Sequence, residues 1–394
     1  MNTRAPSGLV RTDEAVSRHG QAGREWLDAM WRADPLADRV LDEDFGSSSS
    51  TAAVSAALTN GIDPDAPAAL RKLFAFLDSE PDWVDHDRLD RAADALVRYS
   101  AVMGIVLGAA SLLRGAENSI AGKPLAITGR YVSQPAIRSI EVGNWLQKVI
   151  SPGGMARQGD GFAYTVRVRM IHAHVRRGIR HLVTWDDEAW GVPIPQPYMA
   201  FTIAEFGHIA LDAMHRVGVR FTDTELGDIY HLWRYVGHVV GVDHVLNPID
   251  ESDHIRIEKL YRLTSPGPSQ DDRDFVTALT DDYLVPELAN LLPGPHGVTR
   301  AVASATMSAL QRVLIGDEAS DDLHIPASSL THVVSLVGPL LPLVNRARTL
   351  RAGGPSELTR QSYLVRDAEM QRMRAGYRVT HELVDDVHRT HTGS

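Results

Sequence analysis

Apolar residues recur every three or four positions along most of the chain, which is the spacing of one face of an α-helix. The alternation of apolar and polar residues that marks a strand between tight turns is nearly absent. We therefore predict an all-α fold. The helical segments that the pattern predicts are 22–33, 67–79, 87–114, 135–150, 162–183, 197–217, 223–241, 252–264, 272–291, 298–315, 327–349 and 358–377.

The pattern also predicts the domain organisation. We expect residues 1–60 to form an N-terminal helical arm and loop, with Ser47–Ala53 as an exposed loop, and residues 61–394 to form one large helical domain. The apolar run Tyr99–Leu113 is shorter than the roughly 18 residues of a membrane-spanning helix, so we expect a buried helix. Small residues crowd its 99–111 part, which favours tight helix packing over close approach of a flat cofactor.

Composition excludes several classes of protein. The sequence contains no cysteine, which excludes disulfide frameworks, thiolate-ligated haem, cysteine-ligated iron–sulfur clusters and cysteine nucleophiles. The net charge of -10 argues against a nucleic-acid partner. The N-terminal residues carry neither an apolar signal region nor a twin-arginine pair, and we expect a cytoplasmic protein without a transmembrane segment. The sequence leaves the oligomeric state open.

Histidines are concentrated in the middle of the chain: nine of the 17 lie between residues 172 and 254. On the predicted helix 162–183, Thr165, Arg169, His172 and Arg176 share one stripe beside an apolar stripe. Such a stripe suits an anion or a bound oxygen species. A solvated face with ordinary ion pairs is the alternative.

His208 differs from most of these histidines because its helical neighbours Ala204 and Leu211 are apolar. A buried neutral imidazole suits haem or metal ligation, although a hydrogen-bonded core histidine has the same pattern. Asp212, one turn later, is a candidate partner for the second ring nitrogen. His231 and His238 share a face of the helix 223–241, and we expect them to pack around Trp233 and an Arg234 ion pair rather than to bind metal.

A carboxylate metal site is a second possibility. Glu205 and His208 have the Glu-x-x-His spacing of di-iron bundles, and Glu251 and His254 repeat it. The two further glutamates that such a site needs have only weak candidates, Glu117 and Glu141. The sequence has no G-x-S-x-G elbow, P-loop or dinucleotide-binding glycine motif, so hydrolase, kinase and dinucleotide-dependent functions have no support.

Several stretches together resemble the latex-clearing protein or rubber oxygenase family, which belongs to a wider group of MpaB-like oxygenase domains. The resemblance covers about residues 75 to 330, and its most specific parts are the VRVRMIHAHVR and WRYVG blocks. The stretches that carry it are Pro81–Asp85, Val166–Arg176, Gly191–Ile194 with Thr202 and Phe206 downstream, Trp233–Gly241 and Leu314–Glu318.

The resemblance implies an all-helical fold with a globin-like core, one b-type haem on a proximal histidine, and cleavage of an isoprenoid double bond by dioxygen. His208 matches the proximal ligand, and Arg169 matches an arginine on the oxygen side. Where the family has lysine and threonine shortly after this arginine, the chain has His172 and Ala173, which suggests bis-histidine or peroxidase-like chemistry as alternatives. Glu141 is the nearest candidate for the family's catalytic glutamate.

We therefore expect a haem b-dependent oxygenase that acts with dioxygen on an apolar, unsaturated small molecule, isoprenoid or lipid-like. In this hypothesis His208 binds the iron, and Arg169 and His172 orient or polarise dioxygen. Arg176, Thr202 and Phe206 would line the cofactor site, and the apolar helix near 99–113 would line a substrate channel. The alternatives are a metalloenzyme without haem and a non-catalytic haem- or lipid-binding protein.

Overall fold

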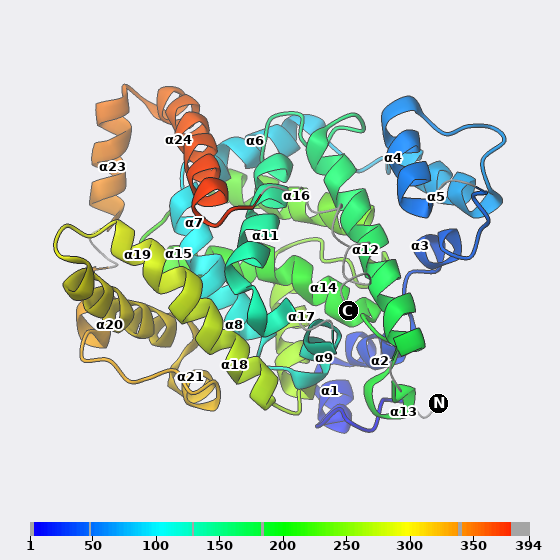
Figure 1. Cartoon of the computed structure of the whole chain (residues 1–394), viewed down its shortest axis with the longest axis horizontal. Coiled ribbons are helices and arrows are strands. Elements are labelled where there is room, and N and C mark those ends of the chain that lie inside the picture. The colour runs from blue at the N-terminus through cyan, green and yellow to red at the C-terminus, as the bar shows by residue number, and fades with distance from the viewer. Residues whose placement is uncertain (1–3, 47–48, 128–129, 183–184, 338–340, 380–394) are drawn as a thin grey trace.

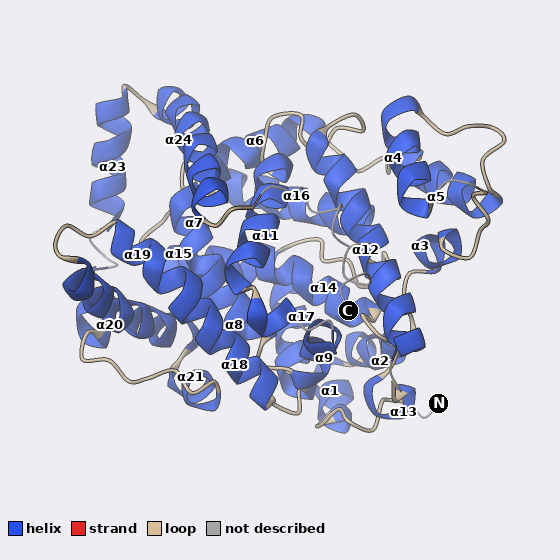
Figure 2. Ribbon diagram, viewed as in Figure 1, coloured by secondary structure: helices blue, strands red, loops and turns tan. Residues whose placement is uncertain are grey.

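The computed structural model describes residues 4–46, 49–127, 130–182, 185–337 and 341–379. All regular structure in this part of the chain is helical, with loops between the helices and no strand (Figure 2). The predicted all-α fold is confirmed. Figure 1 shows the long helix α12 (Asp160–Leu182) between the α3–α5 segment on one side and α16 (Asp223–Val240) on the other.

The first half of the chain forms the long helix α12 and a series of shorter helices. In chain order they are α1 (Thr12–His19), α2 (Gln21–Asp28), η1 (Ala29–Trp31), α3 (Pro35–Val40), α4 (Ser50–Asn60), α5 (Ala68–Asp78), α6 (His86–Val97), α7 (Ser100–Val106), η2 (Leu107–Ser111), α8 (Leu112–Gly115), α9 (Ser119–Ile127), α10 (Arg130–Ser133), α11 (Pro135–Val149), α12 and α13 (Asp187–Trp190).

The second half contains the remaining helices, and among them η3 carries His208. They are α14 (Gln196–Ala204), η3 (Glu205–Ile209), α15 (Ala210–Arg216), α16, α17 (Glu251–Thr264), α18 (Gln270–Leu279), η4 (Thr280–Leu284), α19 (Val285–Asn290), α20 (His296–Ile315), α21 (Asp317–Asp322), α22 (Thr331–Val337), α23 (Leu341–Ala352) and α24 (Pro355–Gly376).

The predicted continuous helix 87–114 is wrong. It breaks at Arg98 and Tyr99, and α6 and the helix that follows are bent by 80° relative to each other. Of the described helices, none taken singly has the length and apolar character needed to cross a membrane; this bent pair meets that test only when its two parts are combined. The bend lets both apolar segments face the same core.

Three five-residue π-helical segments interrupt helices in the core, and two of them divide helices predicted as continuous over 197–217 and 272–291. These segments are η2, η3 and η4, and η2 contacts both of the others. A Cβ on Gly108 of η2 would lie 2.5 Å from Leu284 of η4. The Oγ of Ser111 in η2 donates a hydrogen bond to the carbonyl oxygen of Glu205 in η3 at 2.8 Å. Small residues near 99–111 therefore permit tight helix packing, as predicted.

Residues of the N-terminal 60 pack into the same hydrophobic core as the remainder of the chain. Trp26 is fully buried, and its Nε1 donates a hydrogen bond to Thr264 Oγ1 at 3.1 Å. The expected exposed loop Ser47–Ala53 is wrong over its second half, because α4 begins at Ser50 and Ser49 caps it through the backbone N–H of Ala52. A serine run is thus a helix start as well as a loop signal.

Candidate active site

His208 lies on the π-helical segment η3, where the backbone of Gly207 departs from helical geometry with φ of -84° and ψ of -106°. Nδ1 of His208 is 3.5 Å from the hydroxyl of Tyr230 on α16 and 3.6 Å from Oε1 of Glu251 at the start of α17. The predicted partner Asp212 is wrong, because its carboxylate instead accepts a hydrogen bond from Arg216 at 2.7 Å.

This arrangement favours the tautomer of His208 that carries its proton on Nδ1. A protonated Nδ1 donates toward Glu251 or the Tyr230 oxygen, which leaves the lone pair of Nε2 available. No described residue hydrogen-bonds Nε2. Burial, followed by the negative charge of Glu251, raises the pKa of Tyr230, so its hydroxyl stays protonated. His208 therefore has the anchoring that metal-bound histidines have in other proteins.

Two neighbours of His208 in η3 are also constrained. The carboxyl end of Glu205 lies against Gly115, where a Cβ would be 2.5 Å from Oε1. Burial raises the pKa of Glu205 to about 8, opposed by a weaker interaction with Thr202. Glu205 is therefore a neutral acid at pH 7. Phe206 stacks on Trp233 and meets Trp145 edge to face.

Arg169 is buried on α12 and is committed to an ion pair. Its Nε and Nη2 donate hydrogen bonds to the two carboxylate oxygens of Asp34 at 2.6 and 2.9 Å, and Nη1 donates to the carbonyl oxygen of Val239 at 3.3 Å. The guanidinium also lies over the ring of Phe76. The donors that the sequence analysis assigned to dioxygen thus have protein partners.

The other polar residues of the α12 stripe have different surroundings. Thr165 accepts a hydrogen bond from Trp145 Nε1 at 3.0 Å. The buried Nδ1 of His172 has no hydrogen-bond partner among the described residues. Burial, and then the nearby charge of Arg176, lowers the pKa of His172 to about 4, so this imidazole is neutral at pH 7. Arg176 is buried, and its Nε donates to Asp38 at 2.8 Å.

The remaining candidates separate into packing residues and exposed residues. Thr202 is exposed and donates to the carbonyl oxygen of Tyr198. His231 accepts a hydrogen bond from the backbone N–H of Asp85, and His238 stacks on Phe76. Both histidines pack around Trp83 rather than Trp233, and Arg234 lies over the Trp83 ring instead of forming the expected ion pair.

The carboxylates of the di-iron alternative do not assemble into one cluster. In the part of the chain that the structure describes, no group of three or more His, Asp or Glu side chains is arranged to hold a metal ion. Glu117 accepts hydrogen bonds from Arg114 and Arg262 at 2.6 and 3.1 Å, and Glu141 lies partly buried on α11. This arrangement argues against the di-iron alternative.

The partners that fix the site are not predicted by the sequence pattern. Tyr230, Glu251 and Asp34 each come from a helix other than that of the residue they contact. Asp34 is separated from Arg169 by 135 positions, and periodicity within one helix carries no signal for such a pair. His254, which the sequence suggests as a di-iron ligand or as a bystander on the surface or in the core, packs directly against Gly207.

Comparison with known proteins places the chain in the class of helical oxygenase domains. Residues 97–346, more than half of the chain, match the family described as "ER-bound oxygenase mpaB/B'/Rubber oxygenase, catalytic domain". The chain belongs to this family. The resemblance inferred from the sequence is confirmed.

One relative and one solved structure give the extent of the likeness. A stretch of 191 residues is 25% identical to the rubber oxygenase of Streptomyces sp. (strain K30), and it covers 45% of this chain and 44% of the relative, less than half the length of that protein. A structure of latex clearing protein LCP in the closed state superposes with a TM-score of 0.61 at 19% identity, over 86% of this chain and 91% of the other. This likeness shows a shared fold.

Proposed function

We propose that the chain is a haem b-dependent oxygenase that uses dioxygen to oxidise or cleave an apolar, unsaturated small molecule. One observation carries the haem assignment: Nδ1 of His208 faces Tyr230 and Glu251, while Nε2 has no partner among the described residues. A histidine held in this way fits an axial haem ligand, and the fit requires no cysteine.

In this proposal each residue has a distinct task. Haem, when bound, supplies the iron that activates dioxygen. His208 would provide a nitrogen ligand to the iron, and Tyr230 and Glu251 would fix the orientation of its ring. His172, neutral at pH 7 and with an unpaired Nδ1, is proposed to hydrogen-bond on the oxygen side. Arg169 holds α12 in place through Asp34, and its predicted direct contact with dioxygen stays a prediction.

Membership of an oxygenase family supports the class of reaction, and the substrate class is our inference from it. The aromatic surroundings of Phe206 in η3 exclude water from this part of the core. Exclusion of water protects a reactive oxidant from quenching. Arg176, Thr202 and Phe206 remain candidates for contact with the cofactor.

The absorption spectrum of the purified protein tests the haem assignment. We expect a Soret band with about one haem per chain, and its loss in His208→Ala. The matched control is His244→Ala, because the side chain of His244 is 94% exposed and lies outside the core. A wild-type protein without a Soret band would overturn the haem proposal, and an unchanged band in His208→Ala would overturn the ligand assignment.

Oxygen consumption separates an oxygenase from a carrier. The purified protein is incubated with an isoprenoid that contains several double bonds, and dissolved oxygen and carbonyl products are followed together. An oxygenase consumes oxygen in proportion to product, whereas a haem- or lipid-binding protein returns the isoprenoid unchanged. The second result would exclude catalysis on this class of substrate.

A further inference from the structure

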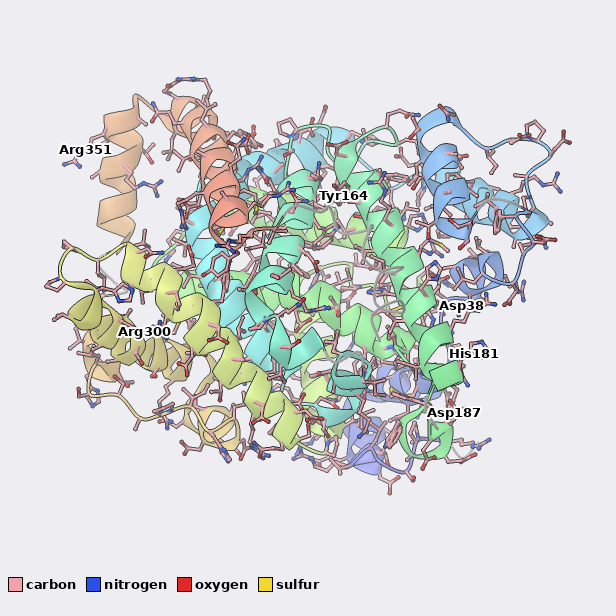
Figure 3. The ribbon with its side chains drawn as sticks, viewed as in Figure 1. Asp38, Tyr164, His181, Asp187, Arg300 and Arg351 are labelled. Carbon is pink, nitrogen blue, oxygen red and sulfur yellow. The ribbon has the colours of Figure 1, made fainter. Side chains whose placement is uncertain are left out.

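A cleft lies beside the second half of α12, away from His208. It has a cavity volume of about 490 Å³, within the usual range for small-molecule sites. One wall carries Arg176, Arg177, Arg180 and His181 of α12. The opposite wall carries Asp38 and apolar residues of the α3 segment and of the loop before α14. In Figure 3 Asp38 and His181 lie on the same side of the molecule, next to the end of α12.

Arg176 at the inner end of the cleft has an unmet hydrogen-bonding capacity. Its side chain is 5% exposed, and Asp38 Oδ1 accepts a hydrogen bond from Nε at 2.8 Å and lies 2.7 Å from Nη2. Nη1 is buried and has no partner among the described residues. A buried guanidinium donor without a protein acceptor is unfavourable, so this atom is available to an acceptor that enters the cleft, either water or a ligand.

Arg177 and Arg180 at the outer end have partners that a ligand can replace. Arg177 donates to the carbonyl oxygen of Leu41, and Arg180 donates to Asp187 at 3.1 and 3.3 Å. Both arginine side chains are about half exposed, at 48% and 47%. Ion pairs of such exposure contribute little to stability, so both side chains are free to turn toward an anion.

The charged residues that line the cleft indicate which kind of anion it can bind. Three arginines face Asp38 and Asp42 in the lining, and Arg180 also pairs with Asp187 at the rim, so the cleft gains one positive charge when a ligand displaces Asp187 from Arg180. This balance suits a single negative charge better than a doubly charged phosphate. Arginine binds carboxylates through two parallel hydrogen bonds. The apolar lining, which includes Leu41 and Val192, suits an apolar chain attached to the carboxylate.

We propose that this cleft is a binding site for the carboxylate of an amphipathic ligand. Arg176 follows His172 by one helical turn on α12, so the cleft begins next to the proposed oxygen side. Two sources supply this chemistry: a substrate with a carboxylate at one end and a propionate of haem. The substrate assignment rests on the proposed function, whereas the carboxylate site itself does not.

The experiment measures binding of oleate and its methyl ester to the purified full-length protein, by displacement of a fluorescent fatty acid. It compares the wild type with Arg176→Gln and with the double variant Arg177→Gln/Arg180→Gln, which leaves the Arg176–Asp38 pair intact. Arg300→Gln is the control, because Arg300 is exposed and lies on the opposite side of the molecule (Figure 3). The haem content of each protein is measured in parallel.

For a substrate carboxylate we expect the wild type to prefer oleate to its ester by about tenfold or more, the preference to fall to near unity in both cleft variants, and haem content to persist. For a haem propionate, haem content falls in the cleft variants and not in the control. Unchanged haem content together with no preference for oleate would overturn the site. A wild type without haem that still prefers oleate would overturn the proposed function and support the cleft.

Discussion

The imidazole ring of His254 occupies the space in which a side chain at position 207 would begin. An ideal Cβ on Gly207 would lie 2.7 Å from His254 Nδ1 and nearer still to Cε1. His254 is fully buried, and neither ring nitrogen has a hydrogen-bond partner among the described residues. The ring thus joins α17 to the non-helical turn of η3 that carries His208. Only glycine leaves room for this contact.

We expect Gly207→Ala to destabilise the protein by about 1–3 kcal/mol, because the added methyl group must displace His254 or the η3 backbone. Displacement of η3 also moves His208, so a haem-loaded variant should have a shifted Soret maximum. Urea unfolding and the absorption spectrum measure the two effects.

The control for this substitution is Gly104→Ala in α7. Gly104 is a helical glycine with nothing within 4 Å of an ideal Cβ, so alanine there should be neutral or stabilising by up to ~1 kcal/mol. A Gly207→Ala variant as stable as Gly104→Ala would show that the His254 contact does not constrain η3.

The buried ion pair between Arg169 and Asp34 leads to a second prediction. Asp34→Ala leaves the guanidinium of Arg169 buried without its counter-charge, and we expect a loss of about 3–5 kcal/mol in the free energy of unfolding. The double variant Asp34→Leu/Arg169→Met removes both charges and should lose less than Asp34→Ala alone. Urea denaturation of the three proteins measures this difference.

Glu14→Ala is the matched control for the ion pair. Glu14 pairs with Arg18 on the surface, where the Arg18 side chain is 66% exposed, and such pairs are worth less than about 1 kcal/mol. If Asp34→Ala costs no more than Glu14→Ala, Arg169 is not stabilised by Asp34 and its role must be sought elsewhere.

The helices follow from local sequence much better than their interruptions do. Helix α16 begins at a capping box formed by Thr222 and Glu225, two residues three positions apart, and its apolar periodicity is regular. The π-helical segments depend instead on contacts between distant helices, such as Gly108 against Leu284. Periodicity within one segment cannot register such a contact, so the interruptions were missed.

In the candidate site, too, local features can be predicted from the sequence and contacts between distant helices cannot. His208 was identified because its own helical neighbours are apolar, which is a local property. Tyr230 and Glu251, which orient its ring, lie on two other helices, and only the fold brings them to Nδ1. Arg169 lies on the predicted helix, but its partner Asp34 is the residue that caps the start of α3, far away in the sequence.

Acid pH should destabilise the protein through its buried histidines. Burial lowers the pKa of His172 to about 4 from an ordinary value of 6.5. Above that ordinary value the imidazole is neutral in both the folded and the unfolded chain. Between these two pKa values only the unfolded chain takes up the proton. The free energy of unfolding therefore falls by about 1.4 kcal/mol for each pH unit below the ordinary value of 6.5.

His172→Leu should remove this share of the pH dependence, as measured by urea unfolding between about pH 6.5 and pH 4.5. His244→Ala is the control, because it also removes a histidine and the side chain of His244 is 94% exposed. Equal pH dependence in wild type and His172→Leu would show that His172 accepts a proton as readily when folded as when unfolded.

Glu205 should make the stability of the protein fall as the pH rises, which is the opposite of the effect of His172. Burial raises its pKa to about 8 from an ordinary value of 4.5. Below the ordinary value both states are protonated, and as pH rises toward 8 only the unfolded chain releases the proton, so the folded state loses stability. Glutamine has the same shape and does not ionise. Glu205→Gln should therefore gain about 2 kcal/mol of stability relative to wild type between pH 6 and pH 8.

Urea denaturation of Glu205→Gln and wild type at these two pH values measures the gain. Glu318→Gln is the matched control, because Glu318 is exposed near the start of α21 and its substitution should have the same small effect at both pH values. A Glu205→Gln variant whose stability relative to wild type does not change with pH would mean that Glu205 is ionised in the folded protein. In that case a hydrogen-bond donor or a cation must lie beside the carboxylate of Glu205 near Gly115, and η3 would carry a carboxylate instead of an acid next to His208.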